Sequence, residues 1–323
     1  WRTMRVLMIG RGRSIALKDL EKYWGKVEVL DTTRSLKPPL KKFDLVVAQE
    51  PLRVIGLLAL LHSKLFREKL VYEVHGDYIP HVKGLDKLFM LHALKSCFAA
   101  RAVNKTIYRR LQELGVERIL YVPGVYVDTE LFKPLKPHEE REGFLLYVGR
   151  FSKEKNLPLL LRSFKVLSER EVEAKLVLVG RGEEYSVIQR FLRSSPALAE
   201  RVKVVNEWLP QRELVKFYCE ASAFVSTSIF EGGPRTIFEA CACETPFIST
   251  PTGVVLDYAE HGREGFIVDW REEEVAEYMA KLLSDVKLRR AMGERARRLV
   301  LEHFEWSKAV KRYAEAYLKL VES

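Results

Sequence analysis

The sequence lacks the features that mark a disulfide-stapled scaffold or a membrane-spanning chain. Its four cysteines, in 323 residues, are too few for a disulfide framework, and their spacing matches no zinc motif. The longest strongly apolar run, Val54 to Leu61, is far shorter than the roughly 20 residues that a membrane-spanning helix needs. No signal-peptide pattern precedes the first predicted strand. We therefore expect a folded cytoplasmic protein that is neither exported nor inserted in a bilayer.

Amides and metal-binding carboxylate pairs are also scarce. Only three Asn and four Gln occur among many Lys, Arg and Glu, a composition typical of proteins selected at high temperature. No Asp-x-Asp pair is present, so the usual carboxylate anchor for a divalent ion is missing. No basic recognition motif is combined with an aromatic stacking platform. We expect no cofactor, no divalent metal and no nucleic acid partner.

The net positive charge comes from the first part of the chain. The formal net charge is +10, and residues 1–135 hold 24 Lys and Arg against 14 Asp and Glu. Residues 136–323 hold 30 of each kind. An anionic partner, if there is one, is therefore expected to bind the first part of the chain.

Short apolar runs alternate with helical patterns along the whole chain, which is typical of a βαβ series. The runs are apolar throughout, without alternation, as expected for parallel strands that helices cover on both faces. The predicted strands are Met4–Ile9, Val27–Leu30, Leu45–Ala48, Leu70–Val74, Ile119–Val122, Phe144–Val148, Leu176–Val179, Val202–Val205, Phe224–Ser226, Phe247–Ser249 and Phe266–Val268.

A charged, proline-containing stretch, Phe132 to Glu142, interrupts this series. It predicts two Rossmann-like, doubly wound α/β domains facing across a cleft, one over 1–135 and one over 136–304. A final amphipathic helix, about 305–323, is expected to pack at the domain junction. Open α/β sheets bind ligands at the carboxyl ends of their strands, so the residues that follow each strand are the candidates for function.

The segment Ser226 to Ser249 holds two glutamates placed around a glycine turn and a helix start. Glu231 stands at the mouth of the turn, and Glu239 lies on the following helix. The N–H groups at a helix start can bind phosphate, and the carboxylates can accept hydrogen bonds from sugar hydroxyls. A solvated helix after an ordinary glycine turn is the alternative. The candidate residues between the glutamates are Gly232, Gly233, Arg235 and Thr236.

A second segment, Tyr147 to Asn156, ends a predicted strand in Gly149 and Arg150 and places Lys155 just before the next helix. An arginine is a planar fork and a lysine a point charge, and the two together can bind a diphosphate. Surface Arg and Lys side chains are usually only solvated. Their position after the first strand of the second domain raises them to candidates.

With both segments, the chain resembles the retaining glycosyltransferases of the GT-B fold, in particular family four. The Glu, seven residues, Glu signature of that family is matched by Glu231 and Glu239. The resemblance implies that Glu231 contacts the donor sugar and Glu239 the ribose. It also implies that Gly149, Arg150 and Lys155 hold the nucleotide diphosphate.

The resemblance implies further site residues near the nucleotide and the reacting centre. Gly180 ends a strand in Gly-x-Gly, and Val205 and Asn206 follow the next strand, where the family uses main-chain atoms. In the first domain the glycine-rich turn at Gly12 would face the donor phosphates, and His75 would lie near the reacting centre. A lone histidine after a strand is otherwise more often structural.

The expected function is transfer of a hexose from a UDP- or GDP-linked sugar to a hydroxyl acceptor, without a metal, as the resemblance implies. The expected catalytic residues are His75, Arg150, Lys155 and Glu231. The acceptor is a sugar, a glycan or a lipid-linked molecule. A nucleotide-sugar epimerase, a phosphorylase of the same fold and a non-catalytic partner subunit that binds nucleotide sugar remain open as alternatives.

Residues 83–110 combine seven Lys and Arg with several apolar side chains. Such a basic amphipathic face can lie on an anionic membrane surface, which would favour a lipid-linked acceptor and place the protein on the inner face of the cell membrane. A helix packed on the sheet, with ordinary solvated charges, explains the same pattern.

Overall fold

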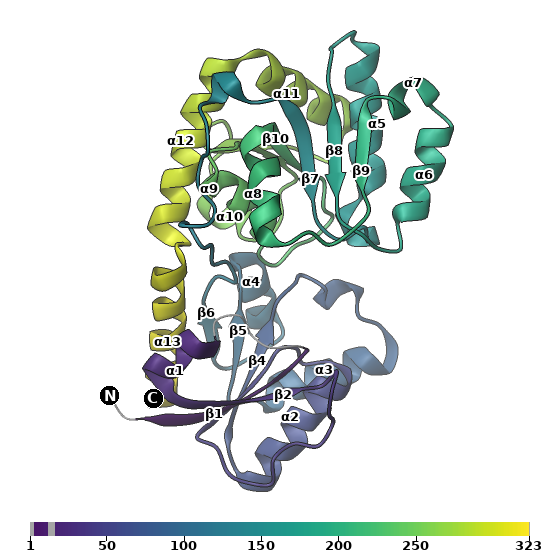
Figure 1. The fold of residues 1–323 in the computed structure, drawn as a ribbon. Coiled ribbons are helices and arrows are strands. Elements are labelled where there is room, and N and C mark those ends of the chain that lie inside the picture. The colour runs from purple at the N-terminus through teal and green to yellow at the C-terminus, as the bar shows by residue number, and fades with distance from the viewer. Residues whose placement is uncertain (1–2, 12–16, 323) are drawn as a thin grey trace. The chain divides into compact units, whose positions relative to one another are not determined.

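The computed structural model describes residues 3–11 and 17–322. It divides into two compact units, of which the first is Trp1–Gly124 with Ser307–Ser323 and the second is Val125–Trp306. Each unit holds a six-stranded sheet in which every neighbouring pair of strands is parallel (Figure 1). The predicted α/β class, with two parallel sheets, is confirmed.

The sheet of the first unit has the strand order β2-β1-β3-β4-β5-β6. The predicted strands of this half are present, and β5, with the sequence Ala-Ala-Arg-Ala, is an addition that sequence analysis missed. Alanine is a weak strand former, and a buried Arg101 hides the pattern. The strands are β1 (Met4–Gly10), β2 (Gly25–Asp31), β3 (Leu45–Ala48), β4 (Lys69–Val74), β5 (Ala99–Ala102) and β6 (Ile119–Tyr121).

Helices cover both faces of this sheet. Successive residues of a strand point to opposite faces, and two neighbours on β4 show which helix lies where. Tyr72 donates a hydrogen bond to the Gly56 carbonyl on α2 at 2.7 Å, whereas Glu73 accepts one from Tyr317 on α13 at 2.7 Å. Accordingly α2 (Arg53–Phe66), α3 (Gly84–Ser96) and α4 (Lys105–Glu113) share one face, and α1 (Leu17–Trp24) and α13 (Trp306–Glu322) share the other.

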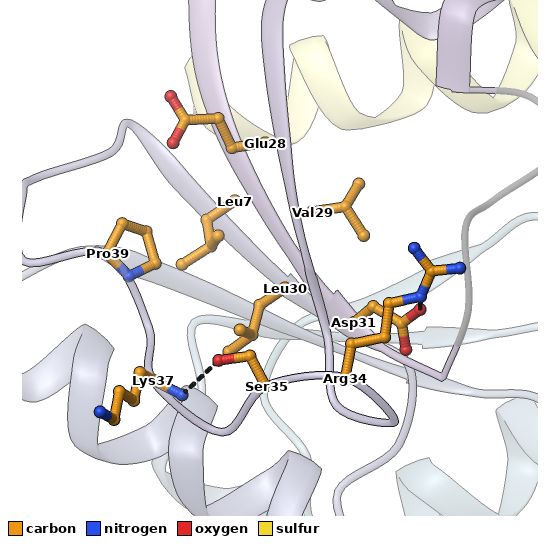
Figure 2. Close-up of a pocket in the computed structure, with 9 residues that line it drawn as sticks. All are labelled: Leu7, Glu28, Val29, Leu30, Asp31, Arg34, Ser35, Lys37 and Pro39. Carbon is orange, nitrogen blue, oxygen red and sulfur yellow. Dashed lines mark hydrogen bonds and ion pairs between the residues drawn. The ribbon is translucent and has the colours of Figure 1, made fainter.

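The connection from β2 to β3 contains no helix, although the sequence pattern favoured one. It is a loop over 32–44 that includes Pro38 and Pro39, which cannot donate backbone hydrogen bonds. His62 on α2 lies 2.9 Å from the Pro39 carbonyl and anchors the loop. Where a helix would cover β1 and β2, a hollow of about 400 Å³ remains, as Figure 2 shows, lined by Leu7, Glu28, Val29, Leu30, Asp31, Arg34, Ser35, Lys37 and Pro39.

The second unit has the strand order β12-β11-β10-β7-β8-β9. Each predicted strand of this half is present, and apolar clusters pack on both sides of the sheet. The strands are β7 (Phe144–Val148), β8 (Leu176–Val179), β9 (Val202–Val205), β10 (Ala221–Ser226), β11 (Phe247–Ser249) and β12 (Gly265–Ile267). The helices are α5 (Leu157–Glu169), α6 (Tyr185–Arg193), α7 (Pro196–Ala199), α8 (Gln211–Glu220), α9 (Arg235–Ala242), α10 (Val255–Tyr258), α11 (Glu272–Ser284) and α12 (Val286–His303).

The division between the units falls after Gly124, before the charged stretch at which sequence analysis placed it. Phe132, within that stretch, is buried in the second unit, and its ring centroid lies 5.9 Å from that of Tyr218. The final helix, α13, joins the first unit, where Trp24 donates a hydrogen bond to the Ala314 carbonyl at 3.1 Å. No helix within residues 3–11 and 17–322 is long and apolar enough to cross a membrane.

Candidate functional site

Two loops at the carboxyl ends of β7 and β10 hold an ion pair in the second unit. Lys155 ends a short 3₁₀ turn, Lys153–Lys155, and its ammonium donates a hydrogen bond to the Glu231 carboxylate. Ser228 donates a second hydrogen bond to the same carboxylate oxygen at 2.8 Å. The two charged side chains are 17% and 13% exposed, so a ligand can still reach them.

Hydrogen bonds to backbone carbonyls hold the two loops together and fix this pair. The Thr227 hydroxyl donates to the Asn156 carbonyl at 3.0 Å, and the Ile229 N–H donates to the Glu154 carbonyl at 2.8 Å. Asn156 has φ 49°, a left-handed conformation that asparagine tolerates better than most residues. The chain after β7 therefore turns sharply into α5 and leaves Lys155 pointing at Glu231.

Arg150 does not share this contact. The Arg150 side chain is 64% exposed, and its guanidinium pairs with the Glu154 carboxylate at 2.9 Å. The sequence pattern predicts that Arg150 and Lys155 converge on one ligand. In the structure they follow the same strand but have different carboxylate partners.

Glu239 lies on α9 and, unlike Glu231, is almost fully buried. Its side chain accepts hydrogen bonds from the Tyr218 hydroxyl at 2.9 Å and from Arg235 Nε at 2.9 Å. Burial raises the pKa of the Glu239 carboxyl, although Arg235 and the Tyr218 hydroxyl act in the opposite direction. The carboxylate is thus held in place on α9 and partly destabilised as an anion.

A pocket of about 220 Å³ brings together several of the predicted residues. It lies at the carboxyl ends of β7 and β8 and at the start of α9. The predicted residues that line it are Gly149, Gly180, Arg235, Thr236 and Glu239. The position fits the rule that open α/β sheets bind ligands at the carboxyl ends of their strands.

The backbone at two glycines makes this pocket. Gly180 has φ 147°, and a Cβ atom there would lie 1.8 Å from the Gly149 carbonyl oxygen. Only glycine allows the strands β7 and β8 to end so close together, which leaves bare main chain at the pocket wall. The Gly180 N–H donates to the Val205 carbonyl at 3.0 Å, so Val205 supports the wall through its main chain.

The remaining predicted residues lie outside the lining of this pocket. Asn206 follows Val205 and is exposed. Gly232 and Gly233 lie in the chain between Glu231 and the start of α9. Gly12 lies outside the described residues.

His75 follows β4 in the first unit, as predicted. Its Nε2 lies 3.0 Å from the Glu73 carboxylate. Glu73 is buried and also accepts hydrogen bonds from Arg101 at 2.6 Å, Tyr313 at 2.8 Å and Tyr317 at 2.7 Å. Burial alone would raise the pKa of Glu73, but Arg101 and these hydrogen bonds hold it well below its usual range.

The model of the family described as glycosyl transferases group 1 matches residues 128–299, more than half of the chain. The chain belongs to this family. CapM of Staphylococcus aureus, a capsular polysaccharide biosynthesis glycosyltransferase, is 31% identical over 275 residues, which are 78% of this chain and 70% of CapM. The N-acetyl-alpha-D-glucosaminyl L-malate synthase of Bacillus anthracis is 31% identical over 180 residues, which are 55% of this chain and 46% of that enzyme. The chain therefore spans about half the length of this second relative.

Solved structures share the fold of this group 1 chain. The sucrose-phosphate synthase from Thermosynechococcus elongatus has a TM-score of 0.81 at 16% identity and covers 99% of both chains. HepE of Anabaena, solved in complex with UDP and glucose, has a TM-score of 0.80 at 16% identity and covers 98% of this chain and 99% of HepE. At this level of identity the likeness establishes the fold, and it confirms the predicted GT-B class.

Several side chains at the site of this group 1 family member were not predicted from the sequence. Trp208 is exposed at the pocket, beside Glu207 and Gln211, and the Arg181 guanidinium lies 5.7 Å from its ring centroid. An aromatic residue shortly after the end of a strand was the available signal. The hydroxyls of Tyr218 and Ser228, which hold the two glutamates, come from α8 and a loop and carry no motif of their own.

Proposed function

We propose that this chain transfers a hexose from a nucleotide diphosphate sugar to a hydroxyl acceptor, with retention at the anomeric carbon and without a divalent metal. The observation that carries the proposal is the partly exposed pair of Lys155 and Glu231, held on two neighbouring loops of the second unit. Family membership supports sugar transfer as the reaction class.

The pocket at the carboxyl ends of β7 and β8, in the same unit as the pair, supports a nucleotide as the donor's leaving group. Bare main chain at Gly149 and Gly180 permits close approach of a ligand, and Glu239 offers a carboxylate to ribose hydroxyls. Trp208 adds an aromatic face for a base. HepE, which shares the fold, was solved with UDP-glucose, and we extend that class of donor to this chain.

Positive charge at the diphosphate would drive the reaction. When the bond between the anomeric carbon and the phosphate oxygen breaks, negative charge grows on the leaving diphosphate. Lys155, Arg150 and the N–H groups at the start of α9 stabilise that charge more than they stabilise the bound donor. These groups would supply what a divalent ion supplies in other transferases, which is why we propose metal independence.

Retention follows if the acceptor attacks from the side that the diphosphate leaves. The acceptor oxygen then bonds to the anomeric carbon, and its proton passes to the leaving phosphate oxygen, so no protein base is needed for that step. Glu231 would contact the donor sugar and keep Lys155 in place. We include His75 among the catalytic residues, and we propose a sugar, a glycan or a lipid-linked alcohol as acceptor.

A thermal-shift screen against UDP-, GDP- and ADP-linked sugars, each with and without EDTA, tests the donor site. A ligand that binds only the folded state raises the melting temperature, and we expect a shift with one nucleotide family that EDTA leaves unchanged. The anomeric configuration of the product, read by NMR, tests retention. A shift that EDTA abolishes, an inverted product, or an epimerised or phosphorolysed sugar in place of a glycoside would each contradict the proposal.

A further inference from the structure

One helix of the first unit exposes a continuous apolar stripe. On α2, the side chains of Val54, Leu57, Leu61 and Leu65 are all exposed, and Leu65 is 68% exposed. Their spacing of three and four residues places them along one side of the helix. The opposite side, with Ile55 and Ala59, is buried in the core of the unit. This helix is therefore apolar on both its core side and its outer side.

The neighbouring segments extend this stripe. Leu85 and Leu88 are exposed on α3, and α3 lies beside α2, because a Cβ atom at Gly56 would lie 3.2 Å from the Phe89 ring. The two helices are neighbours on one face of the sheet (Figure 1).

Leu36 and Leu40 are exposed on the loop over 32–44, and Leu40 is 85% exposed. This loop is bound to α2 through Pro39 and His62 and closes the hollow of Figure 2. We call the exposed leucines and valine of α2, α3 and this loop the apolar face.

The charges around the apolar face are mostly positive. The loop over 32–44 holds Arg34, Lys37, Lys41 and Lys42 against one acidic residue, Asp44, and two of these basic side chains pair with acidic residues of β2, Arg34 with Asp31 and Lys41 with Glu28. α2 has no Asp or Glu at all, and in α3 the one acidic residue, Asp86, lies 4.0 Å from Arg53. The exposed lysines of the two helices are Lys64, Lys87 and Lys95.

We propose that the apolar face docks this chain on an anionic lipid membrane surface. Leucines would enter the boundary between headgroups and acyl chains, and the surrounding Lys and Arg would contact the anionic headgroups. A second copy of the chain fits poorly, because the same basic surface would face itself. Protein interfaces are enriched in aromatic residues and depleted in lysine, whereas the described residues of these three segments expose lysines and no aromatic side chain.

The apolar face overlaps only in part with the surface that the sequence pattern suggested, since Leu85 and Leu88 belong to both. Residues 83–110 were expected to present an amphipathic face, but Met90 and Leu94 are buried against the sheet. Of the apolar positions in that pattern, Leu88 is exposed, so α3 contributes to the apolar face with only part of the predicted residues. Three of the seven exposed leucines of the apolar face lie on α2, within and just beyond the apolar run that is too short to span a bilayer.

Co-sedimentation of the full chain with vesicles tests this proposal, without any donor sugar present, so its outcome is independent of the proposed function. The vesicles are pure phosphatidylcholine or an equimolar mixture with phosphatidylglycerol. We expect binding to the mixed vesicles that weakens in about 0.5 M salt, and little binding to the neutral ones. Equal binding to both vesicle types, or to neither, would overturn the proposal.

Two sets of variants locate the surface. The triple variant Leu57→Gln, Leu61→Gln and Leu65→Gln should bind the mixed vesicles at least about tenfold more weakly, since each buried leucine contributes strongly. Its melting temperature should stay near that of the wild type, because these side chains are exposed. Leu135→Gln with Leu256→Gln, exposed leucines of the second unit, is the matched control and should bind like the wild type.

The charge variant Lys64→Glu with Lys87→Glu should also lose at least about tenfold, because each basic residue near an anionic surface strengthens binding about fivefold. Lys203→Glu with Lys287→Glu makes the same charge change on the second unit and should have the smaller effect. The proposal fails if the triple variant sediments with vesicles like the wild type. It also fails if the wild type binds no vesicle and forms a dimer that the triple variant abolishes.

Discussion

The two units each place a carboxylate close to the carboxyl end of a strand and pair it with a basic side chain, but the surroundings differ. In the first unit, Glu73 is buried and accepts hydrogen bonds from Arg101, Tyr313 and Tyr317. In the second unit, Glu231 stays 13% exposed beside Lys155. A carboxylate enclosed by donors stabilises the fold, whereas one that solvent can reach is able to exchange a protein partner for a ligand.

The pKa directions of the buried carboxyls sharpen this contrast. Arg101, His75 and Tyr317 lower the pKa of Glu73 in spite of its burial. Burial raises the pKa of Glu239 in spite of Arg235 and Tyr218. The first unit therefore favours its buried anion, and the second holds one at a cost that a bound ligand with hydroxyl groups can reduce.

The largest effect is expected from Glu73→Gln, which leaves the Arg101 charge buried without its anion. Such a change should lower the free energy of unfolding at pH 7 by about 3 kcal/mol or more. Because folding lowers the pKa of Glu73 from its ordinary value of 4.5, the loss should shrink as the pH falls below that value. Urea unfolding at several pH values measures it.

The exposed Glu117 of the same unit supplies the control for that experiment, since Glu117→Gln should change the free energy of unfolding by less than about 0.5 kcal/mol. Equal losses of unfolding free energy in the two variants would show that Glu73 and its hydrogen-bond partners do not stabilise the fold.

Lys155→Ala should have the reverse profile, with a large effect on turnover and a small one on stability. Loss of a fixed cation at the leaving diphosphate typically costs about 10²-fold or more in rate. The turnover of donor sugar, followed as nucleotide diphosphate release, measures the effect. Lys153→Ala, an exposed lysine of the same turn, should keep the wild-type rate, and a comparable loss in both variants would argue against a specific contact.

Glu239→Gln should weaken donor binding by about tenfold. The ribose hydroxyls of the donor would then bond to a neutral amide in place of the charged Glu239 carboxylate. The raised pKa of Glu239 also predicts the direction in which pH changes the stability of this variant relative to the wild type. The wild type carries the cost of the buried anion above that pKa, so the variant should gain stability relative to it as the pH rises above 4.5. If the variant instead loses stability relative to the wild type over this range, burial does not control the pKa of Glu239.

The smallest effect is expected from Arg150→Ala. An exposed ion pair such as the one with Glu154 contributes about 0.5 kcal/mol to stability, so melting should hardly change. The rate should fall severalfold, less than for Lys155→Ala, because the guanidinium must leave Glu154 to reach a diphosphate. An unchanged rate in EDTA would remove Arg150 from the proposed mechanism.

The sequence predicted the strands of the second unit well, because its apolar runs lie in a fully covered parallel sheet. It missed β5, where Arg101 is buried only because Glu73, far away in the chain, neutralises it. It identified Glu231 and Glu239 from their spacing. It could not show that Tyr218 and Ser228 hold them, or that Arg150 faces Glu154, because these contacts depend on side-chain directions set by the folded chain.

The exposed leucines of α2 were likewise beyond the sequence pattern. Val54 to Leu61 is apolar on every side of the helix, so periodicity alone cannot separate the core side from the outer side. Only the packing of Ile55 and Ala59 into the core shows which leucines remain outside.

We propose that the open pair of Lys155 and Glu231 in the second unit marks the donor site. The most direct test is the thermal shift that the best nucleotide sugar of the screen produces, in EDTA, in the wild type, Lys155→Ala and Lys153→Ala. We expect the shift to persist in Lys153→Ala and largely to disappear in Lys155→Ala. A full shift in Lys155→Ala would contradict it.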